Sequence, residues 1–216
     1  MPVEHYDNVL YPLQDRVIAL FQGSPFYLTG GTALSRGYYH HRYSDDLDYF
    51  VNDHPDFPRI AERQIVKLNE TLGDLNVALR GDNFLRLFVS PERLKIEMIN
   101  DVPAHIGPLV SHPALGVIDS KENILANKLT ALVDRSLPKD IADIYVLLND
   151  GLSVKKALVD ANSKAAGIAP LMVAKILAEF DYSLLDSEIR WIRSVPGQEI
   201  GLFLIGVARR IVTGEV

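Results

Sequence analysis

The sequence changes character at a proline-rich segment, residues 103–113, and this change divides the chain into two parts. Before the segment, short apolar runs typical of strands alternate with stretches of helical period; after it, almost every stretch has helical period. With 216 residues, the chain is long enough for one large domain or two small ones. We therefore expect an α/β domain over residues 1–115 and an all-helical domain over residues 116–216.

The positions of individual elements follow from hydrophobic periodicity and from turn residues. The expected strands are 26–29, 45–51, 76–80, 84–89 and 93–99, and the expected helices are 6–21, 32–39, 58–72, 120–135, 139–149, 153–162, 169–180, 186–194 and 198–213. Every expected strand precedes the proline-rich segment, so the sheet is assigned entirely to the first domain.

The composition excludes several kinds of site. The chain has no cysteine, which rules out disulfides, thiolate zinc sites and cysteine nucleophiles. No apolar run approaches the roughly 20 residues of a membrane span, and residues 1–13 lack a signal-peptide pattern, so we expect a cytoplasmic protein with no membrane contact. The net charge of −6 disfavours broad, non-specific coating of nucleic acid.

An acidic pair lies on the second expected strand, in the stretch Ser44-Asp-Asp-Leu-Asp-Tyr-Phe50. Side chains two residues apart share a face of a strand, so Asp46 and Asp48 point the same way, roughly 6.7 Å apart along the chain. At an effective dielectric near 20, two such charges repel by about 2.5 kcal/mol. A bound cation would offset this repulsion, and carboxylate oxygens suit Mg²⁺ or Mn²⁺. The alternative is an edge strand whose aspartates are simply solvated.

A glycine turn precedes the acidic pair by a short distance. Gly30 and Gly31 end the first expected strand, and a helix is expected to begin at Thr32. Glycines there let backbone N–H groups approach a phosphate, and a helix N-terminus favours negative charge. The turn alone is weak evidence, since no Walker or G-x-G-x-x-G pattern accompanies it. Its significance comes from the acidic pair that follows.

A third carboxylate is Glu97, in the expected strand 93–99. Its neighbours Ile96 and Met98 occupy the opposite face, so Glu97 is placed to join the acidic pair as a metal ligand. An exposed Glu97 paired with Lys95 on an ordinary amphipathic strand explains the pattern equally well.

The helical part carries charged residues on otherwise apolar helix faces. Lys128 lies on the same stripe as Ile124 and Leu132, where an ammonium either snorkels to solvent or serves a phosphate. Asp140 and Asp143 share a face of the next helix; the helix dipole accounts well for Asp140 in the first turn and less well for Asp143.

These motifs together resemble the AbiEii/AbiGii-type nucleotidyltransferase toxins of the polymerase-beta-like nucleotidyltransferase superfamily. The residues that carry the resemblance are Gly30-Gly31-Thr32-Ala33-Leu34, His41-Arg42-x-Ser44-x-Asp46-Leu47-Asp48-x-Phe50, Lys95-Ile96-Glu97, Lys128 and Arg135-x-x-x-Lys139-Asp140-x-x-Asp143. They follow the order of the family's motifs and span residues 26–148. The resemblance implies a polymerase-beta-like α/β (α+β) fold with a mixed sheet, followed by an all-α C-terminal region that completes the active site.

The resemblance also implies an activity, the transfer of a nucleoside monophosphate from an NTP to an acceptor with release of pyrophosphate. Asp46 and Asp48, with Glu97, would hold one or two Mg²⁺ or Mn²⁺ ions. The residues assigned to nucleotide binding are Gly30, Gly31, Thr32, Arg42, Ser44 and Lys128.

Further roles fall in the helical part. Lys128 would neutralise the phosphates, and either Asp140 or Asp143 would orient Lys128 or assist deprotonation of the acceptor. The implied acceptor is RNA such as tRNA, or a protein, and the implied partner is a cognate antitoxin of a toxin-antitoxin or abortive-infection system.

Two other functions remain open at this point. A small-molecule nucleotidyltransferase acting on an antibiotic would keep the catalysis and change the acceptor; the net charge of −6 leans toward a small or protein acceptor and counts against RNA. A non-catalytic nucleotide-binding domain is disfavoured because Asp46, Asp48 and Lys128 are all present.

Overall fold

The computed structural model describes residues 3–90 and 93–215 and divides the chain into two compact units. The first comprises Met1–Tyr38 and Tyr43–Asp119, and the second comprises Tyr39–Arg42 and Ser120–Val216. The boundary at 119/120 lies four residues after the boundary expected from the sequence. The segment 39–42 is a larger difference from the expected domains, because it lies within the expected α/β domain and yet belongs to the helical unit.

The first unit holds all the strands of the described residues. Its helical segments are α1 (Val3–His5), η1 (Tyr6–Leu10), α2 (Tyr11–Phe21), α3 (Gly30–Leu34), η2 (Ser35–Tyr39, whose last residue belongs to the second unit) and α4 (Phe57–Leu72), η1 and η2 being π-helical. Its strands are β1 (Tyr27–Thr29), β2 (Leu47–Asn52), β3 (Leu75–Arg80), β4 (Phe84–Val89), β5 (Leu94–Asp101), β6 (Val110–His112) and β7 (Gly116–Ile118).

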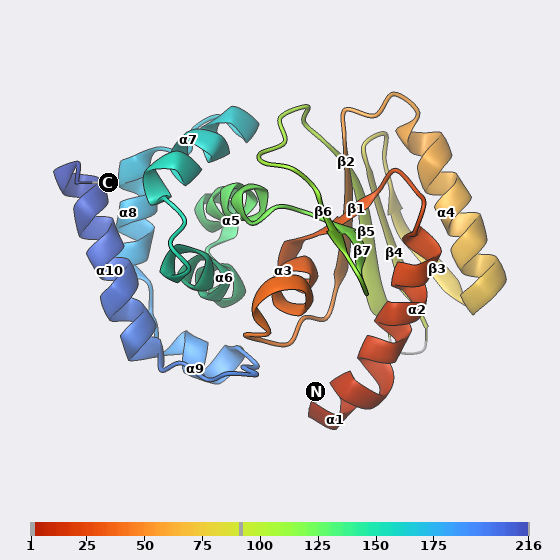
Figure 1. Ribbon diagram of the computed structural model, residues 1–216, viewed down its shortest axis with the longest axis horizontal. Helices are drawn as coiled ribbons and strands as arrows, with labels where there is room; N and C mark the ends of the chain where they lie inside the picture. The colour runs from red at the N-terminus through yellow and green to blue at the C-terminus, as the bar shows by residue number, and fades with distance from the viewer. Residues whose placement is uncertain (1–2, 91–92, 216) are drawn as a thin grey trace. The chain divides into compact units, whose positions relative to one another are not determined.

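These strands form one mixed sheet in the order β3-β4-β5-β2-β1-β7-β6 (Figure 1). β2 lies near the middle, antiparallel to β1 and parallel to β5. β7 runs parallel to β1 on the other side, while β3–β4, β4–β5 and β6–β7 are antiparallel pairs. Both neighbours of β2 therefore place their own residues beside the acidic pair.

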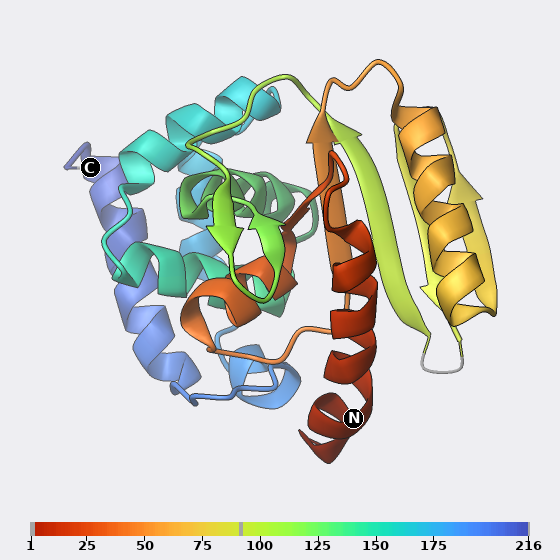
Figure 2. The same ribbon diagram turned by 45° about the vertical axis from the view of Figure 1, so that its right-hand side comes forward.

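One face of this sheet is buried beneath α2 and α4, which lie side by side against it (Figure 2). Leu47, Tyr49 and Val51 of β2 point to this face and are buried. Phe21 of α2 stacks on Tyr49 with 3.6 Å between ring centroids. Because side chains alternate along a strand, Asp48 points to the opposite face.

The second unit is all helical in its described residues. Its helices are α5 (Lys121–Arg135), α6 (Pro138–Asn149), α7 (Val154–Lys164), α8 (Pro170–Glu179), α9 (Leu184–Glu188) and α10 (Gly197–Thr213). The Ser120 hydroxyl accepts a hydrogen bond from the Asn123 backbone N–H and caps α5, and Ser153 caps α7 in the same way through Lys156. The mixed sheet followed by helices confirms the fold expected from the sequence.

Two parts of the chain differ from the expected elements by more than a shift of one to three residues at an end. The helix expected over 186–194 ends at Glu188, because the chain beyond it is extended: the backbone N–H groups of Ile192 and Arg193 both donate to the His41 carbonyl, at 2.9 and 3.2 Å. The strands β6 and β7 were not expected, since each has only three residues and begins beside or within the proline-rich segment.

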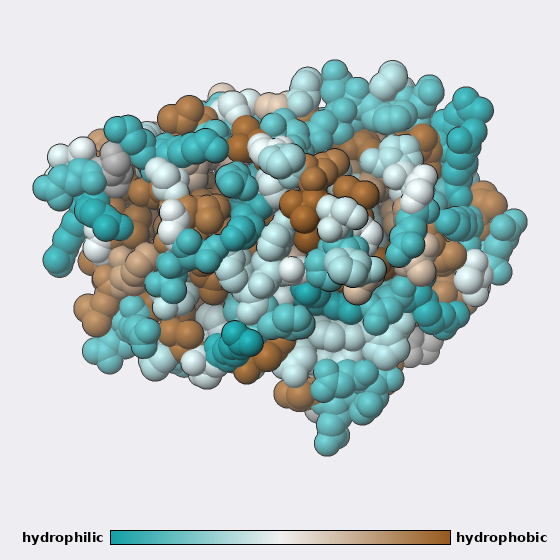
Figure 3. All heavy atoms as spheres, in the orientation of Figure 1, coloured by the Kyte–Doolittle hydropathy of each residue, from teal (hydrophilic) through white to brown (hydrophobic). Residues whose placement is uncertain are grey.

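Hydrophobic side chains on the surface occur in small groups separated by hydrophilic ones on the face drawn in Figure 3. Several lie on the helices of the second unit, where Leu171, Leu202 and Val212 are each more than 60 % exposed (65 %, 71 % and 64 %). Scattered exposed residues of this kind are normal on proteins. In the part of the chain that the structure describes, no helix has the length and apolar character needed to cross a membrane.

Candidate active site

The acidic pair lies at the beginning of β2, on the sheet face opposite α2 and α4. Asp48 is the second residue of β2, and Asp46 precedes the strand by one residue. In the strand registers, Asp48 stands beside Thr29 of β1 on one side and Glu97 of β5 on the other. The parallel pairing of β2 with β5 therefore brings Glu97 next to the acidic pair.

The β1–α3 turn, where β1 ends at Thr29 and α3 begins at Gly30, packs directly against Asp48. The helix thus begins two residues before Thr32, the start expected from the sequence. Gly30 has a φ of +67°, a backbone conformation that favours glycine. A Cβ atom at this position would lie 2.4 Å from Oδ2 of Asp48. Such a separation is far below van der Waals contact, so only a residue without a side chain lets the carboxylate approach the turn this closely.

Hydrogen bonds fix the segment that leads into β2. The Thr32 hydroxyl on α3 lies 2.9 Å from the Ser44 hydroxyl and also bonds the Asp46 carbonyl oxygen. The buried Gln14 amide of α2 donates to the carbonyl oxygens of Ser44 and Asp45, at 3.0 and 3.2 Å. The β1–α3 turn and the acidic pair are thus one connected structure, which includes the proposed phosphate-binding residues Gly30, Thr32 and Ser44; Gly31 is buried on the same turn.

Two basic side chains face the carboxylates from the sheet. The Lys95 ammonium lies 3.0 Å from Oδ2 of Asp46 and 3.3 Å from Oε2 of Glu97, and the Arg86 guanidinium donates to Oε1 of Glu97 at 2.6 Å. Burial alone would raise the pKa of Glu97, but Lys95 and Arg86 outweigh it and hold that pKa below its usual value. Burial would lower the pKa of Lys95, but Asp46, Asp48 and Glu97 outweigh it and raise that pKa.

The donor set of this cluster fits a hard divalent cation. Asp46, Asp48 and Glu97 offer carboxylate oxygens on one face, and the absence of a Cβ atom at Gly30 leaves room for Oδ2 of Asp48. Over residues 3–90 and 93–215, no group of three or more His, Asp or Glu side chains has the arrangement that holds a metal ion. At this site, Lys95 and Arg86 contact the oxygens of Asp46 and Glu97.

Asp119, the residue directly after β7, supports the same turn and was not singled out in the sequence. Its side chain is fully buried; the Thr29 hydroxyl donates to Oδ2 at 2.5 Å, and Nε2 of His105 lies 3.0 Å from Oδ1. The Tyr38 hydroxyl donates to its backbone carbonyl at 2.6 Å. In the sequence, Asp119 could have been noticed only as an acid that directly follows the apolar pair Val117-Ile118. That position indicates a site residue only if residues 116–118 are known to form a strand.

The second unit contains the other charged residues predicted from the sequence. Lys128 of α5 is buried, and its ammonium lies 2.9 Å from Oδ1 of Asp140 and 2.6 Å from Oδ2 of Asp143, both on α6. Arg135 adds a bond to Asp140 at 2.9 Å. Burial would lower the pKa of Lys128, but Asp143 and Asp140 outweigh it and raise that pKa.

The segment 39–42 completes this buried cluster. The Arg42 guanidinium binds both oxygens of Asp143, at 2.7 and 2.8 Å, and Nε2 of His41 lies 2.9 Å from Oδ1. Burial would raise the pKa of Asp143, but Arg42 and Lys128 outweigh it and hold that pKa well below its usual value. Burial lowers the pKa of His41 in spite of the carboxylate beside it. The structure thus places Arg42 with Asp143, and its assignment to nucleotide binding stays a prediction.

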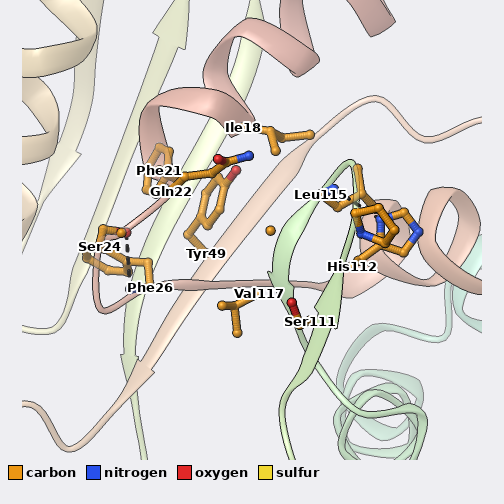
Figure 4. A pocket seen from close by; sticks show the side chains of 13 residues that line it. Ile18, Phe21, Gln22, Ser24, Phe26, Tyr49, Ser111, His112, Leu115 and Val117 are labelled. Atoms are coloured by element: carbon orange, nitrogen blue, oxygen red, sulfur yellow. Dashed lines mark hydrogen bonds between the residues drawn. The ribbon is translucent and has the colours of Figure 1, made fainter.

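A cavity of about 320 Å³ lies on the α2 side of the sheet, away from the carboxylates. Figure 4 shows Phe21 and Tyr49 on one side of it and His112, Leu115 and Val117 on the other. Tyr49 faces this cavity while its neighbour Asp48 faces the other way, so the cavity is separate from the candidate site.

Comparisons with known proteins show the family and the fold of the chain. The family model described as "Nucleotidyl transferase AbiEii toxin, Type IV TA system" matches residues 13–190. A comparison with curated proteins gives no match. Among solved structures, JHP933 from Helicobacter pylori is 18 % identical, with 99 % of this chain and 94 % of that chain covered and a TM-score of 0.62.

Two further solved structures have related folds. The nucleotidyltransferase toxin MenT4 from Mycobacterium tuberculosis H37Rv is 16 % identical, with 98 % of this chain and 86 % of that chain covered and a TM-score of 0.57. The antibiotic-resistance factor ANT(2'')-Ia is 16 % identical, with 70 % of this chain and 89 % of that chain covered and a TM-score of 0.54. At these identities, the likeness shows a shared fold.

Proposed function

The chain belongs to the nucleotidyl transferase AbiEii toxin family, and from this premise we propose that it transfers a nucleoside monophosphate from an NTP to an RNA acceptor, such as tRNA, in the presence of Mg²⁺ or Mn²⁺. The observation that supports this most directly is the acidic pair of β2, held against the Gly30 turn with Glu97 beside it. The reaction uses NTP, which is found in the cytoplasm, and we place the enzyme there.

The transfer exchanges one bond for another at the α-phosphorus. An oxygen of the acceptor forms a bond to this phosphorus, the bond to the oxygen that bridges the α- and β-phosphates breaks, and pyrophosphate leaves. The acceptor hydroxyl loses its proton to solvent water as the new bond forms. A divalent ion bound at Asp46 and Asp48, with Glu97 as a third ligand, would neutralise phosphate charge and activate the attacking oxygen.

The β1–α3 turn is proposed to bind the phosphates. Backbone N–H groups of Gly30, Gly31 and Thr32 supply donors at the beginning of a helix, where negative charge is favoured. The Thr32 and Ser44 hydroxyls hold this turn against the segment that carries Asp46. The same contacts keep the turn and the carboxylates in a fixed relation, which the in-line displacement requires.

In the second unit, we propose that Asp140 and Asp143 are positioning residues rather than general bases. Both carboxylates are fully buried and bind cations, and the pKa of each is below its usual value, so each is a poor proton acceptor near neutral pH. Their partners Lys128 and Arg42 supply positive charge of the kind that binds phosphate. The two aspartates hold these cations in fixed positions.

The antibiotic alternative has a specific observation in its favour, the fold shared with ANT(2'')-Ia together with the net charge of −6. The alternatives are separated by incubating the protein with each α-labelled NTP, Mg²⁺ and either total RNA or an aminoglycoside. We expect label on RNA in the wild type and none with Asp48→Asn. Label on the aminoglycoside alone would support the alternative, and no transfer to either would contradict both.

A cognate antitoxin is proposed as the protein partner because the family model describes a toxin-antitoxin system. Expression of the chain alone is expected to stop bacterial growth, and co-expression of the adjacent open reading frame is expected to restore it. Normal growth on expression of an active enzyme would contradict the toxin role in that host.

A further inference from the structure

Lys95 is placed where it competes with a metal ion for the acidic cluster. Its ammonium lies between two of the three carboxylates, 3.0 Å from Oδ2 of Asp46 and 3.3 Å from Oε2 of Glu97. Lys95 and Glu97 are two residues apart on β5, so both side chains leave the same face of the sheet as Asp46 and Asp48.

The contacts of Lys95 differ from those of the other cation at this cluster. Arg86 binds Glu97 at Oε1, whereas Lys95 is the cation whose contacts join Glu97 to Asp46. A metal ion held by Asp46 and Glu97 together would use the oxygens that Lys95 now contacts. The ammonium carries one positive charge and a divalent ion carries two, so both cannot occupy this position without strong repulsion.

The lysine and its partners are also accessible to an incoming ion. The side chains of Lys95, Asp46 and Glu97 are 25 %, 28 % and 12 % exposed. A flexible stem of four carbons lets the ammonium leave the carboxylates without any movement of β5. Exchange of the two cations therefore needs only a change of side-chain rotamer.

We propose that Lys95 is an internal competitor for the divalent ion: it neutralises Asp46 and Glu97 when no metal is bound, and it must leave them when the metal binds. The proposal rests on the proposed function, in which Asp46, Asp48 and Glu97 hold the metal. It predicts that the ion alone binds weakly and that removal of the lysine tightens metal binding even in the absence of nucleotide.

The test measures Mn²⁺ binding to the full-length protein without nucleotide, by electron paramagnetic resonance of free Mn²⁺ and by isothermal titration calorimetry at constant pH. We expect Lys95→Met to bind Mn²⁺ at least about tenfold more tightly than the wild type, because a positive charge next to the ion is lost. Lys95→Arg keeps the charge and is expected to bind like the wild type. Binding by Lys95→Met within about twofold of the wild type would overturn the proposal.

Arg86→Met is the matched control, because it removes one positive charge from the same carboxylate without touching Asp46. A general charge effect would tighten Mn²⁺ binding as much in Arg86→Met as in Lys95→Met, and this result would overturn competition at the shared oxygens. Competition predicts a gain at least about threefold smaller for Arg86→Met.

Asp48→Asn, made alone and with Lys95→Met, separates this proposal from the proposed function. If Mn²⁺ binding does not depend on Asp48 in either protein, the assigned metal site is wrong. If Asp48→Asn abolishes binding while Lys95→Met changes nothing, the site stands and only the competition is wrong. If Lys95→Met does not fold, Lys95→Gln replaces it, because a glutamine amide can donate a hydrogen bond to Asp46 without carrying a charge. Lys95→Gln is expected to show a larger rise in melting temperature with Mn²⁺ than the wild type.

Discussion

Substitution of Gly30 by alanine tests how closely the β1–α3 turn must approach the acidic pair. The new Cβ atom would lie 2.4 Å from Oδ2 and 3.3 Å from Cγ of Asp48. Ordinary contacts of carbon atoms begin near 3.5 Å, so the turn and the carboxylate must separate by about 1 Å. A misplacement of about 1 Å can lower an enzymatic rate by about 100-fold. The φ of +67° adds a backbone cost of about 1–2 kcal/mol for a residue with a side chain.

Gly73 provides a control that shares the positive φ and lacks the contact. It ends α4 with a φ of +63°, and a Cβ atom there would have no neighbour within 4 Å. We expect both alanine variants to lose about 1–3 kcal/mol of unfolding free energy, measured by urea denaturation. Transfer of an α-labelled nucleotide should fall about 100-fold in Gly30→Ala and stay within about threefold of the wild type in Gly73→Ala. Equal rates in the two variants would refute the reasoning.

Three further predictions concern the charged clusters. Asp48→Asn should abolish transfer while the melting temperature without metal stays equal or rises, because repulsion from Asp46 is relieved; a large fall in melting temperature would make Asp48 a structural residue. Arg42→Met should cost about 3–5 kcal/mol in urea denaturation, because the buried Asp143 loses its bidentate partner; a cost below about 1 kcal/mol would show that Lys128 and His41 suffice. Since the pKa values of Asp140 and Asp143 are lowered by folding, their stabilisation is complete above their unfolded pKa, near 4, and is lost as the pH falls through their lowered native values. Unfolding free energies that stay constant from pH 6 to pH 2 would contradict this.

The candidate site residues of the first unit could be identified from the sequence because most of them are close together in it. The Gly30 turn, Ser44 and the acidic pair lie within 19 residues, and alternation along a strand predicts that Asp46 and Asp48 share a face, although β2 begins one residue after Asp46. The place of Glu97 beside them required the parallel pairing of β2 with β5, which the sequence did not reveal. The sequence left open whether Glu97 pairs with Lys95, and the structure shows that Lys95 contacts Asp46 as well.

The contacts of the segment 39–42 were beyond prediction because they depend on a carboxylate about 100 residues away. Nothing local marks His41 and Arg42 as partners of a helix near residue 143; only the burial of Asp143 makes such cations necessary. The helix expected over 186–194 ended early for a related reason. Its C-terminal part is extended and bonds the backbone of this segment, so a tertiary contact outweighs helical propensity.

The contribution of four early residues to the helical unit has a consequence for dissecting the protein. A fragment cut at the boundary, 120–216, would contain every helix from α5 to α10 and still lack the guanidinium and imidazole that neutralise Asp143. Such a fragment would have to bury this carboxylate with Lys128 as its remaining cation, or unfold around it. The segment 39–42 is therefore a necessary part of the helical unit. A fragment that begins after the last strand does not contain this unit in full.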